Sequence, residues 1–174
     1  MDEKRIEHAE RNFKVYLQEG KIKEISNTET LIYETYLRNA RESLNVANQL
    51  FDNKTSSLWI VVTSYYSMYY MACAYLYKLG YKSSGEIVHQ VINEALIFQG
   101  RHKIKNYLLK NYTEEKEEAL NIVDSHLRNY ENEKTKRATF QYETTENIKE
   151  SKAQTSLNRA KEFLTLIEEI LQNF

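Results

Sequence analysis

The chain has 174 residues, of which 41% are hydrophobic, and a formal net charge of −1 at pH 7. This length fits one domain with a real core, and the charge excludes a strong overall attraction to nucleic acid or anionic membranes. Pro is absent and Gly occurs four times, which argues against an all-β fold and favours long helices. The single Cys73 excludes an intramolecular disulfide and fits a reducing compartment.

The amino-terminal residues predict a short helix rather than a targeting signal. Met1 to His8 contains no uninterrupted apolar segment, so we expect a cytoplasmic protein. Apolar residues then recur at steps of three and four up to Gly20, which predicts a helix that ends there. Residues 21–28 are expected to be a connector, and residues 1–28 an addition to the same domain.

Two long helices are predicted next. In residues 29–52 the apolar positions step by three and four, and the short link Asp52-Asn53 predicts an antiparallel helical hairpin. Residues 55–80 form the second helix, with Thr55, Ser56 or Ser57 as the cap and Gly80 as the stop. Apolar side chains cover nearly its whole circumference, so we expect it to be buried in the bundle.

The central segment is long enough to cross a bilayer, but its tyrosines argue against this. Tyr65, Tyr66, Tyr69 and Tyr70 would lie at mid-depth, whereas membrane proteins keep Tyr at the two interfaces. We therefore expect no membrane contact. Three small residues of this helix lie close to one line along it: Ser64, Ser67 and Ala74. Such a line lets a neighbouring backbone approach closely, so we expect a homodimer.

The second half of the chain predicts three more helices. A shorter helix is expected over residues 86–98 with His89 on its polar side, then one that starts at a Thr113 cap, and a last one from Thr145. The fold class is therefore all-α, an antiparallel up-and-down bundle of four to five main helices with an extra N-terminal helix.

The sequence gives little support for metal or cofactor chemistry. No pair of the four His residues stands at a spacing of four, and no Gly-rich phosphate loop is present. We expect no metal and no cofactor, and a surface or capping role for each His.

One basic segment is a candidate site for nucleotide or RNA. Lys134, Lys136 and Arg137 are followed by Phe140 and Tyr142, and cations beside aromatic rings hold a phosphate while a base stacks. The alternative, a solvated charged face, is the commoner origin of such a run.

Three stretches resemble the HEPN domain, the "higher eukaryotes and prokaryotes nucleotide-binding" family, in its small stand-alone prokaryotic branch. They are Arg38-Asn-Ala-Arg-Glu-Ser-Leu, Ser64-Tyr-Tyr-Ser-Met-Tyr-Tyr-Met-Ala-Cys-Ala-Tyr-Leu and Lys78-Leu-Gly-Tyr-Lys-Ser. The resemblance covers residues 29–174 and implies a helical bundle, commonly a homodimer. Many members are partners of a minimal nucleotidyltransferase in toxin–antitoxin systems, and many are metal-independent RNases that use an Arg and a His four to six residues apart.

This sequence departs from that RNase motif. No Arg precedes a His at the required spacing, and in Arg137-Ala-Thr-Phe-Gln-Tyr142 a Tyr takes the place of the His. A phenol with a pKa of about 10 is a poor general base at neutral pH. The resemblance therefore implies a nucleotide- or RNA-binding or regulatory partner of a nucleotidyltransferase, with Lys134, Lys136, Arg137 and Phe140 in contact with the ligand. The alternative is an active metal-independent endoribonuclease that uses Arg137 and Tyr142, with a His brought in by the fold.

Overall fold

A computed structural model describes the backbone of residues 1–135 and 146–174, and the side chains of residues 1–124 and 150–174. Within these residues the chain forms six helices and two short strands. In chain order they are α1 (Glu3–Gln18), β1 (Ile22–Glu24), α2 (Thr30–Asp52), α3 (Ser57–Lys78), β2 (Tyr81–Ser83), α4 (Val88–Gly100), α5 (Asn106–Thr135) and α6 (Glu146–Gln172). The prediction of an all-α bundle is confirmed.

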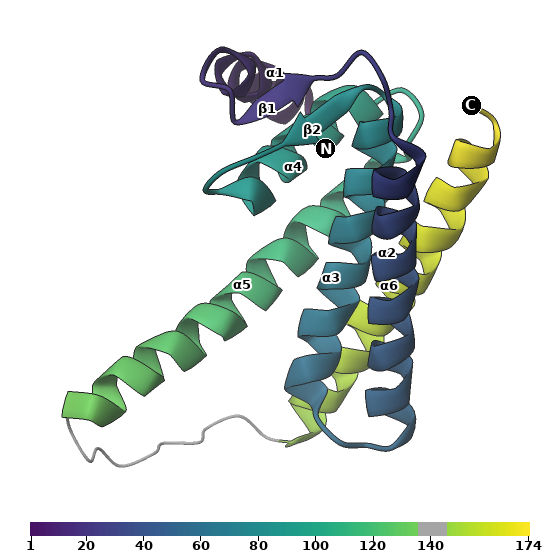
Figure 1. Cartoon of the computed structure of the whole chain (residues 1–174). Helices are drawn as coiled ribbons and strands as arrows, with labels where there is room; N and C mark the ends of the chain where they lie inside the picture. The colour runs from purple at the N-terminus through teal and green to yellow at the C-terminus, as the bar shows by residue number, and fades with distance from the viewer. Residues whose placement is uncertain (136–145) are drawn as a thin grey trace.

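Helix α3 is the central element of the bundle. It lies beside α2 and α6, and α5 runs away from these three helices at an angle (Figure 1). Most of its side chains are buried, including Tyr65, Met68 and Tyr75. Among the described residues, no helix combines the length and the apolar character needed to cross a bilayer.

The predicted ends of α3 are confirmed. The Ser56 hydroxyl accepts a hydrogen bond from the Trp59 backbone N–H at 3.3 Å, as an N-cap does. Gly80 follows the helix with φ +90°, in the left-handed region that only Gly adopts without strain. The hairpin between α2 and α3 also occurs where it was predicted, after Asp52.

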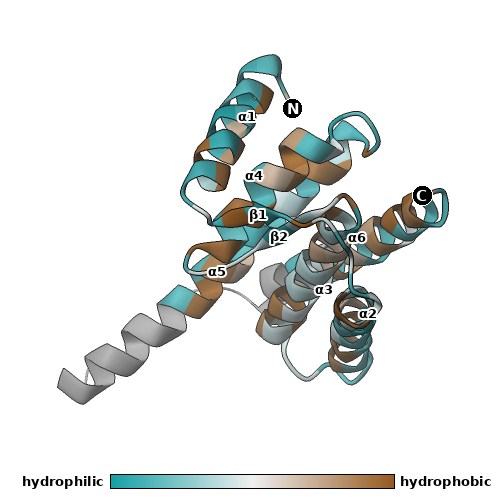
Figure 2. Ribbon diagram, turned by 45° about the horizontal axis from the view of Figure 1, so that its top comes forward, coloured by the Kyte–Doolittle hydropathy of each residue, from teal (hydrophilic) through white to brown (hydrophobic). Residues whose placement is uncertain are grey.

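A small layer of α1, β1, β2 and α4 covers one end of the bundle, as Figure 2 shows. The predicted connector 21–28 differs here, because β1 within it pairs antiparallel with β2, with Ile22 opposite Ser83. Phe13 of α1 contacts Tyr81 of β2 and Phe98 of α4, with ring centroids 5.2 and 5.3 Å apart. These aromatic contacts hold α1 against the rest of the chain.

The predicted start of α5 was wrong. Thr113 is not a cap but lies inside the helix, which begins at Asn106. Its hydroxyl lies 3.0 Å from the Leu109 carbonyl oxygen, one turn earlier, and so bonds back along an existing helix. The preceding turn packs inward through Leu108 and Tyr112, which are buried, and this burial overrides the cap signal.

The small-residue line on α3 packs inside its own chain. Ser64, Ser67 and Ala74 are each 0% exposed, so they meet the neighbouring helices of the bundle rather than an outside surface. The homodimer therefore stays a prediction that depends on the family resemblance.

Candidate functional site

The residues predicted to form the site lie outside the described part of the chain. Lys136, Arg137, Phe140 and Tyr142 fall in residues 136–145, and Lys134 lies near the end of α5, where side chains are not described. The catalytic and binding roles assigned to these residues therefore stay predictions. The described residues do contain a second candidate, formed between α3, α4 and α5.

Four tyrosines of α3 and one histidine of α4 form an aromatic group, called here the tyrosine–histidine cluster: Tyr65, Tyr66, Tyr69, Tyr70 and His89. Because Tyr65 and Tyr69, and likewise Tyr66 and Tyr70, are four residues apart, they form two adjacent columns on one side of the helix. Ring centroids of neighbouring members lie between 4.5 and 6.2 Å apart. The Tyr69 and His89 rings form the closest pair, at 4.5 Å.

The expected surface or capping role of His89 is met only in part, because this residue lies between the core and the surface. Its side chain is partly buried, and its Nδ1 lies 2.7 Å from the Tyr65 hydroxyl oxygen. Burial lowers the pKa of His89, and the nearby positive charge of Lys116 lowers it further. His89 is therefore neutral at pH 7, with a proton on one of its two ring nitrogens.

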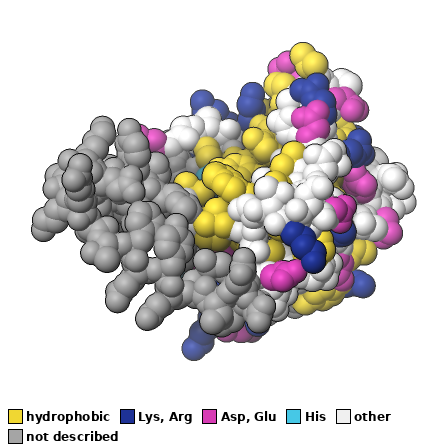
Figure 3. Space-filling view, turned by 90° about the horizontal axis from the view of Figure 1, so that it is seen from below, with side chains coloured by type: hydrophobic (Ala, Val, Ile, Leu, Met, Phe, Trp, Pro, Cys, Tyr) yellow, Lys and Arg dark blue, Asp and Glu magenta, His cyan; other side chains and the backbone are white. Residues whose placement is uncertain are grey.

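The exposure of the rings increases from one side of the cluster to the other. Tyr65 is fully buried, whereas Tyr66, Tyr69 and Tyr70 are partly exposed. Burial raises the pKa values of Tyr65, Tyr69 and Tyr70, so these phenols keep their protons at neutral pH. In the face seen from below, hydrophobic side chains gather near the centre (Figure 3). Partly exposed rings beside a neutral imidazole offer a surface on which a flat ligand can stack.

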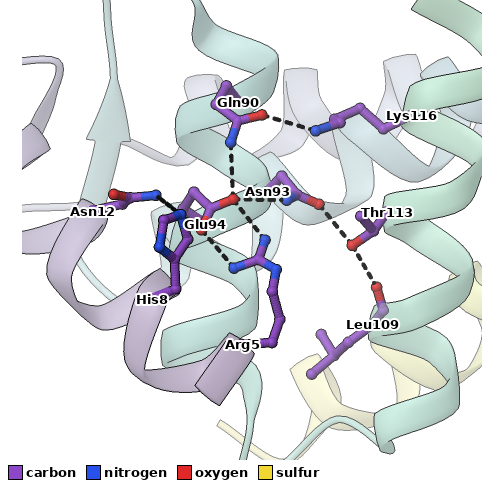
Figure 4. Close-up of polar contacts among 9 residues, drawn as sticks. All are labelled: Arg5, His8, Asn12, Gln90, Asn93, Glu94, Leu109, Thr113 and Lys116. Carbon is purple, nitrogen blue, oxygen red and sulfur yellow. Dashed lines mark hydrogen bonds and ion pairs between the residues drawn. The ribbon is translucent and has the colours of Figure 1, made fainter. Parts of the chain in front are cut away.

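Figure 4 shows a polar network centred on Glu94 of α4, the helix that also carries His89. The Glu94 carboxylate is 1% exposed and forms a two-pronged ion pair with Arg5 of α1, at 2.7 and 2.6 Å. It also accepts hydrogen bonds from the side-chain amides of Gln90 at 2.9 Å and Asn93 at 3.2 Å. A buried carboxylate requires such partners, so the network fixes α4 relative to α1.

Gln90 joins this network to α5. Its amide nitrogen donates to Glu94 while its amide oxygen accepts a 2.9 Å hydrogen bond from the Lys116 ammonium. Gln90 directly follows His89 in α4, so the network and the cluster share one stretch of helix. The sequence analysis did not predict a role for Gln90 or Lys116. The signals available in the sequence were weak: Gln90 follows His89 directly, and Lys116 lies four residues after Tyr112.

Within the described ranges, no three His, Cys, Asp or Glu side chains come together in a group that could hold a metal ion.

Comparison with known proteins identifies the family. The model of the HEPN domain matches residues 33–170, well over half of the chain. No curated protein and no solved structure matches the sequence. The chain belongs to the HEPN domain family.

Proposed function

We propose that this HEPN domain binds RNA or a nucleotide by stacking a base on the partly exposed rings of the tyrosine–histidine cluster. The observation that carries the proposal is the packing of Tyr66 and Tyr69 of α3 against His89, with Tyr70 beside both tyrosines and each of these rings partly open to solvent. Every base has a flat π face, so such a surface accepts bases with little regard to sequence.

The charges near the cluster suit an anionic ligand. Lys116 supplies a positive charge near His89. The basic residue Lys134 lies near the end of α5, and Lys136 and Arg137 follow this helix in the sequence. Overall the chain carries a net charge of −1, so local cations are needed to attract a phosphate. The predicted contacts of Lys134, Lys136, Arg137 and Phe140 with the ligand belong to this proposal.

The test is binding of a labelled single-stranded oligoribonucleotide, followed by fluorescence anisotropy, to the wild type and to Tyr69→Leu. Loss of one stacking ring costs about 1–3 kcal/mol, so we expect affinity to fall by roughly five- to 150-fold. Tyr107→Leu is the matched control, because Tyr107 is a 42% exposed tyrosine that hydrogen-bonds Glu162, away from the cluster. Equal affinity of the wild type and both variants would reject the stacking surface.

The biological role that we propose is that of a binding or regulatory partner of a minimal nucleotidyltransferase, in a toxin–antitoxin-like pair. The support is the membership of the HEPN family together with the replacement of the RNase His by Tyr142 in the sequence. Co-expression with the product of an adjacent nucleotidyltransferase gene, followed by copurification, tests it. Separate elution of the two proteins at micromolar concentration would contradict it.

A second candidate function is favoured by one observation. His89 is neutral at pH 7 and partly exposed, and is the kind of group that a metal-independent endoribonuclease needs to move the 2′-hydroxyl proton. In this alternative His89 would act with Arg137 and Tyr142. We place it second, because the Nδ1 atom of His89 is already engaged by Tyr65.

A further inference from the structure

Lys116 is a buried cation that has no carboxylate partner among the side chains that the structure describes. Its residue is only 6% exposed, and the hydrogen bond from its ammonium goes to the neutral Gln90 amide oxygen, at 2.9 Å. No carboxylate oxygen of the described residues lies within 4.0 Å of its Nζ atom. Buried lysines are ordinarily paired with an acid, because removing an ammonium from water costs free energy that a neutral partner repays only in part.

The negative charge of Glu94 is already neutralised by another residue. Glu94 forms its ion pair with Arg5, and Gln90 stands between Glu94 and Lys116 as a bridge (Figure 4). Burial lowers the pKa of Lys116 and outweighs the opposite effect of the negative charges of Glu117 and Glu94. The position is therefore poised to gain from an added anion.

Lys116 also lies beside the tyrosine–histidine cluster. Tyr112, one helical turn earlier on α5, packs against Tyr65 with ring centroids 6.0 Å apart. The residue that holds the Lys116 ammonium, Gln90, follows His89 directly. The cation, the imidazole and the aromatic rings thus come from α5, α4 and α3, and Lys116 is near enough to His89 for its charge to lower the imidazole pKa.

We propose that Lys116 and His89 together bind a phosphate group of the RNA or nucleotide whose base stacks on the cluster. This inference deepens the proposed function and rests on it. The Tyr65 hydroxyl oxygen and His89 Nδ1 lie 2.7 Å apart. We take the tautomer in which the hydroxyl donates to Nδ1, which leaves the ring proton of neutral His89 on Nε2 for a phosphate oxygen.

The ammonium has donors to spare for the same phosphate. It carries three N–H groups, and Gln90 accepts from one of them. Gln90 is itself partly exposed, so the ammonium lies one hydrogen bond away from solvent. The flexible four-carbon stem of Lys116 allows the short movement that a ligand requires.

The first experiment compares AMP with adenosine on the full chain by isothermal titration calorimetry, and measures the salt dependence of oligoribonucleotide binding. We expect Lys116→Met to remove the preference for AMP and to weaken RNA binding roughly ten- to a hundredfold, as loss of a charged hydrogen bond does. The slope of log affinity against log salt should fall by about 0.7, the value for one phosphate contact on a single strand. Lys110→Met is the control, because Lys110 is an exposed lysine of the same helix that faces Glu114 at 3.7 Å.

The second readout separates a ligand contact from a structural role. Lys116→Met removes a buried charge without an acid partner, so its melting temperature without ligand should equal or exceed that of the wild type. AMP should raise the melting temperature of the wild type and leave that of Lys116→Met unchanged. A variant that unfolds at a lower temperature yet binds AMP like the wild type would show that Lys116 is structural and would overturn the inference.

The outcomes for the two sites differ. If Tyr69→Leu weakens RNA binding while Lys116→Met and the wild type bind AMP equally well, the stacking surface stands and the phosphate site is wrong. If the wild type binds neither RNA nor AMP, the proposed function and this inference both fail. If Lys116→Met loses the preference for AMP over adenosine and Lys110→Met keeps it, the result supports the proposed function and the phosphate site.

Discussion

Arg5 of α1 and Glu94 of α4 form a two-pronged ion pair, with N···O distances of 2.7 and 2.6 Å. Arg5 lies outside the matched HEPN region and Glu94 lies inside it. The side chain of Arg5 is 29% exposed and that of Glu94 is 1% exposed. The pair thus attaches the N-terminal helix to the family's bundle, and it is a point where the two can be separated by mutation.

Arg5→Ala should destabilise the protein by about 3 kcal/mol, because it leaves the buried Glu94 carboxylate without its counter-charge. Urea denaturation at pH 7 measures this change. Arg11→Ala is the control, since Arg11 pairs with Glu7 on the exposed face of the same helix at 4.0 Å, and a surface pair contributes under about 1 kcal/mol. Equal losses in the two variants would show that the Glu94 network does not hold α1.

Gly80→Ala should also destabilise the chain, by about 1–2 kcal/mol. At φ +90° a side chain is strained, and the added Cβ would lie 3.4 Å from the Ile25 carbonyl oxygen. Gly85 has a similar φ of +87°, but no heavy atom lies within 4 Å of a Cβ there. The difference between Gly80→Ala and Gly85→Ala in thermal unfolding therefore isolates the contact with the segment after β1, and a larger loss at Gly85 would contradict it.

The helices could be predicted wherever a long apolar pattern had clear ends. The pattern in residues 29–52 and the signals at Ser56 and Gly80 depend on local chemistry, and both helices form where they were expected. The strands β1 and β2 have three residues each, which is too short for a period to show. Their pairing joins segments that are far apart in the sequence, so no local sequence pattern predicts it.

The site was harder to predict for the same reason. His89 looked polar on its own helix, and only the packing of α4 across α3 brings its ring against Tyr65 and Tyr69. Lys116 looked like one of several lysines, and its burial depends on the contact between α4 and α5. Arg137 and Tyr142 were chosen from a sequence pattern, and they lie outside the described residues, so their roles stay predictions.

His89 should make stability depend on pH below neutrality. Its folded-state pKa is lowered by burial and by Lys116, so the unfolded chain binds a proton to this residue more readily than the folded chain does. Stability is therefore lost as pH falls below the unfolded value of about 6.5. The groups that face His89 are Tyr65, Tyr66 and Tyr69 of α3 and Lys116 of α5.

The measurement for His89 is urea denaturation between about pH 7 and pH 5. His89→Gln should lose less stability over this interval than the wild type, because the residue that takes up the proton is absent. His102→Gln, at an exposed histidine beside Arg101, is the comparison variant. A His89→Gln curve parallel to that of the wild type would show that His89 titrates alike in both states.

RNA should remain uncut by the purified protein in EDTA. In the segment that we expect to correspond to the RNase motif of the family, Tyr142 stands where a His is expected, and a phenol with a pKa of about 10 accepts a proton poorly at pH 7. His89 is neutral, but its Nδ1 atom is engaged by Tyr65 at 2.7 Å, and its other nitrogen carries the proton in the arrangement proposed above. Gel analysis of structured and unstructured RNA tests this, with Arg137→Ala, His89→Ala and the control His102→Ala beside the wild type. Cleavage that persists in chelator, disappears in the first two variants and survives in the third would reverse the order of the two functions, because it would require Arg137 and His89 to act on the same phosphate.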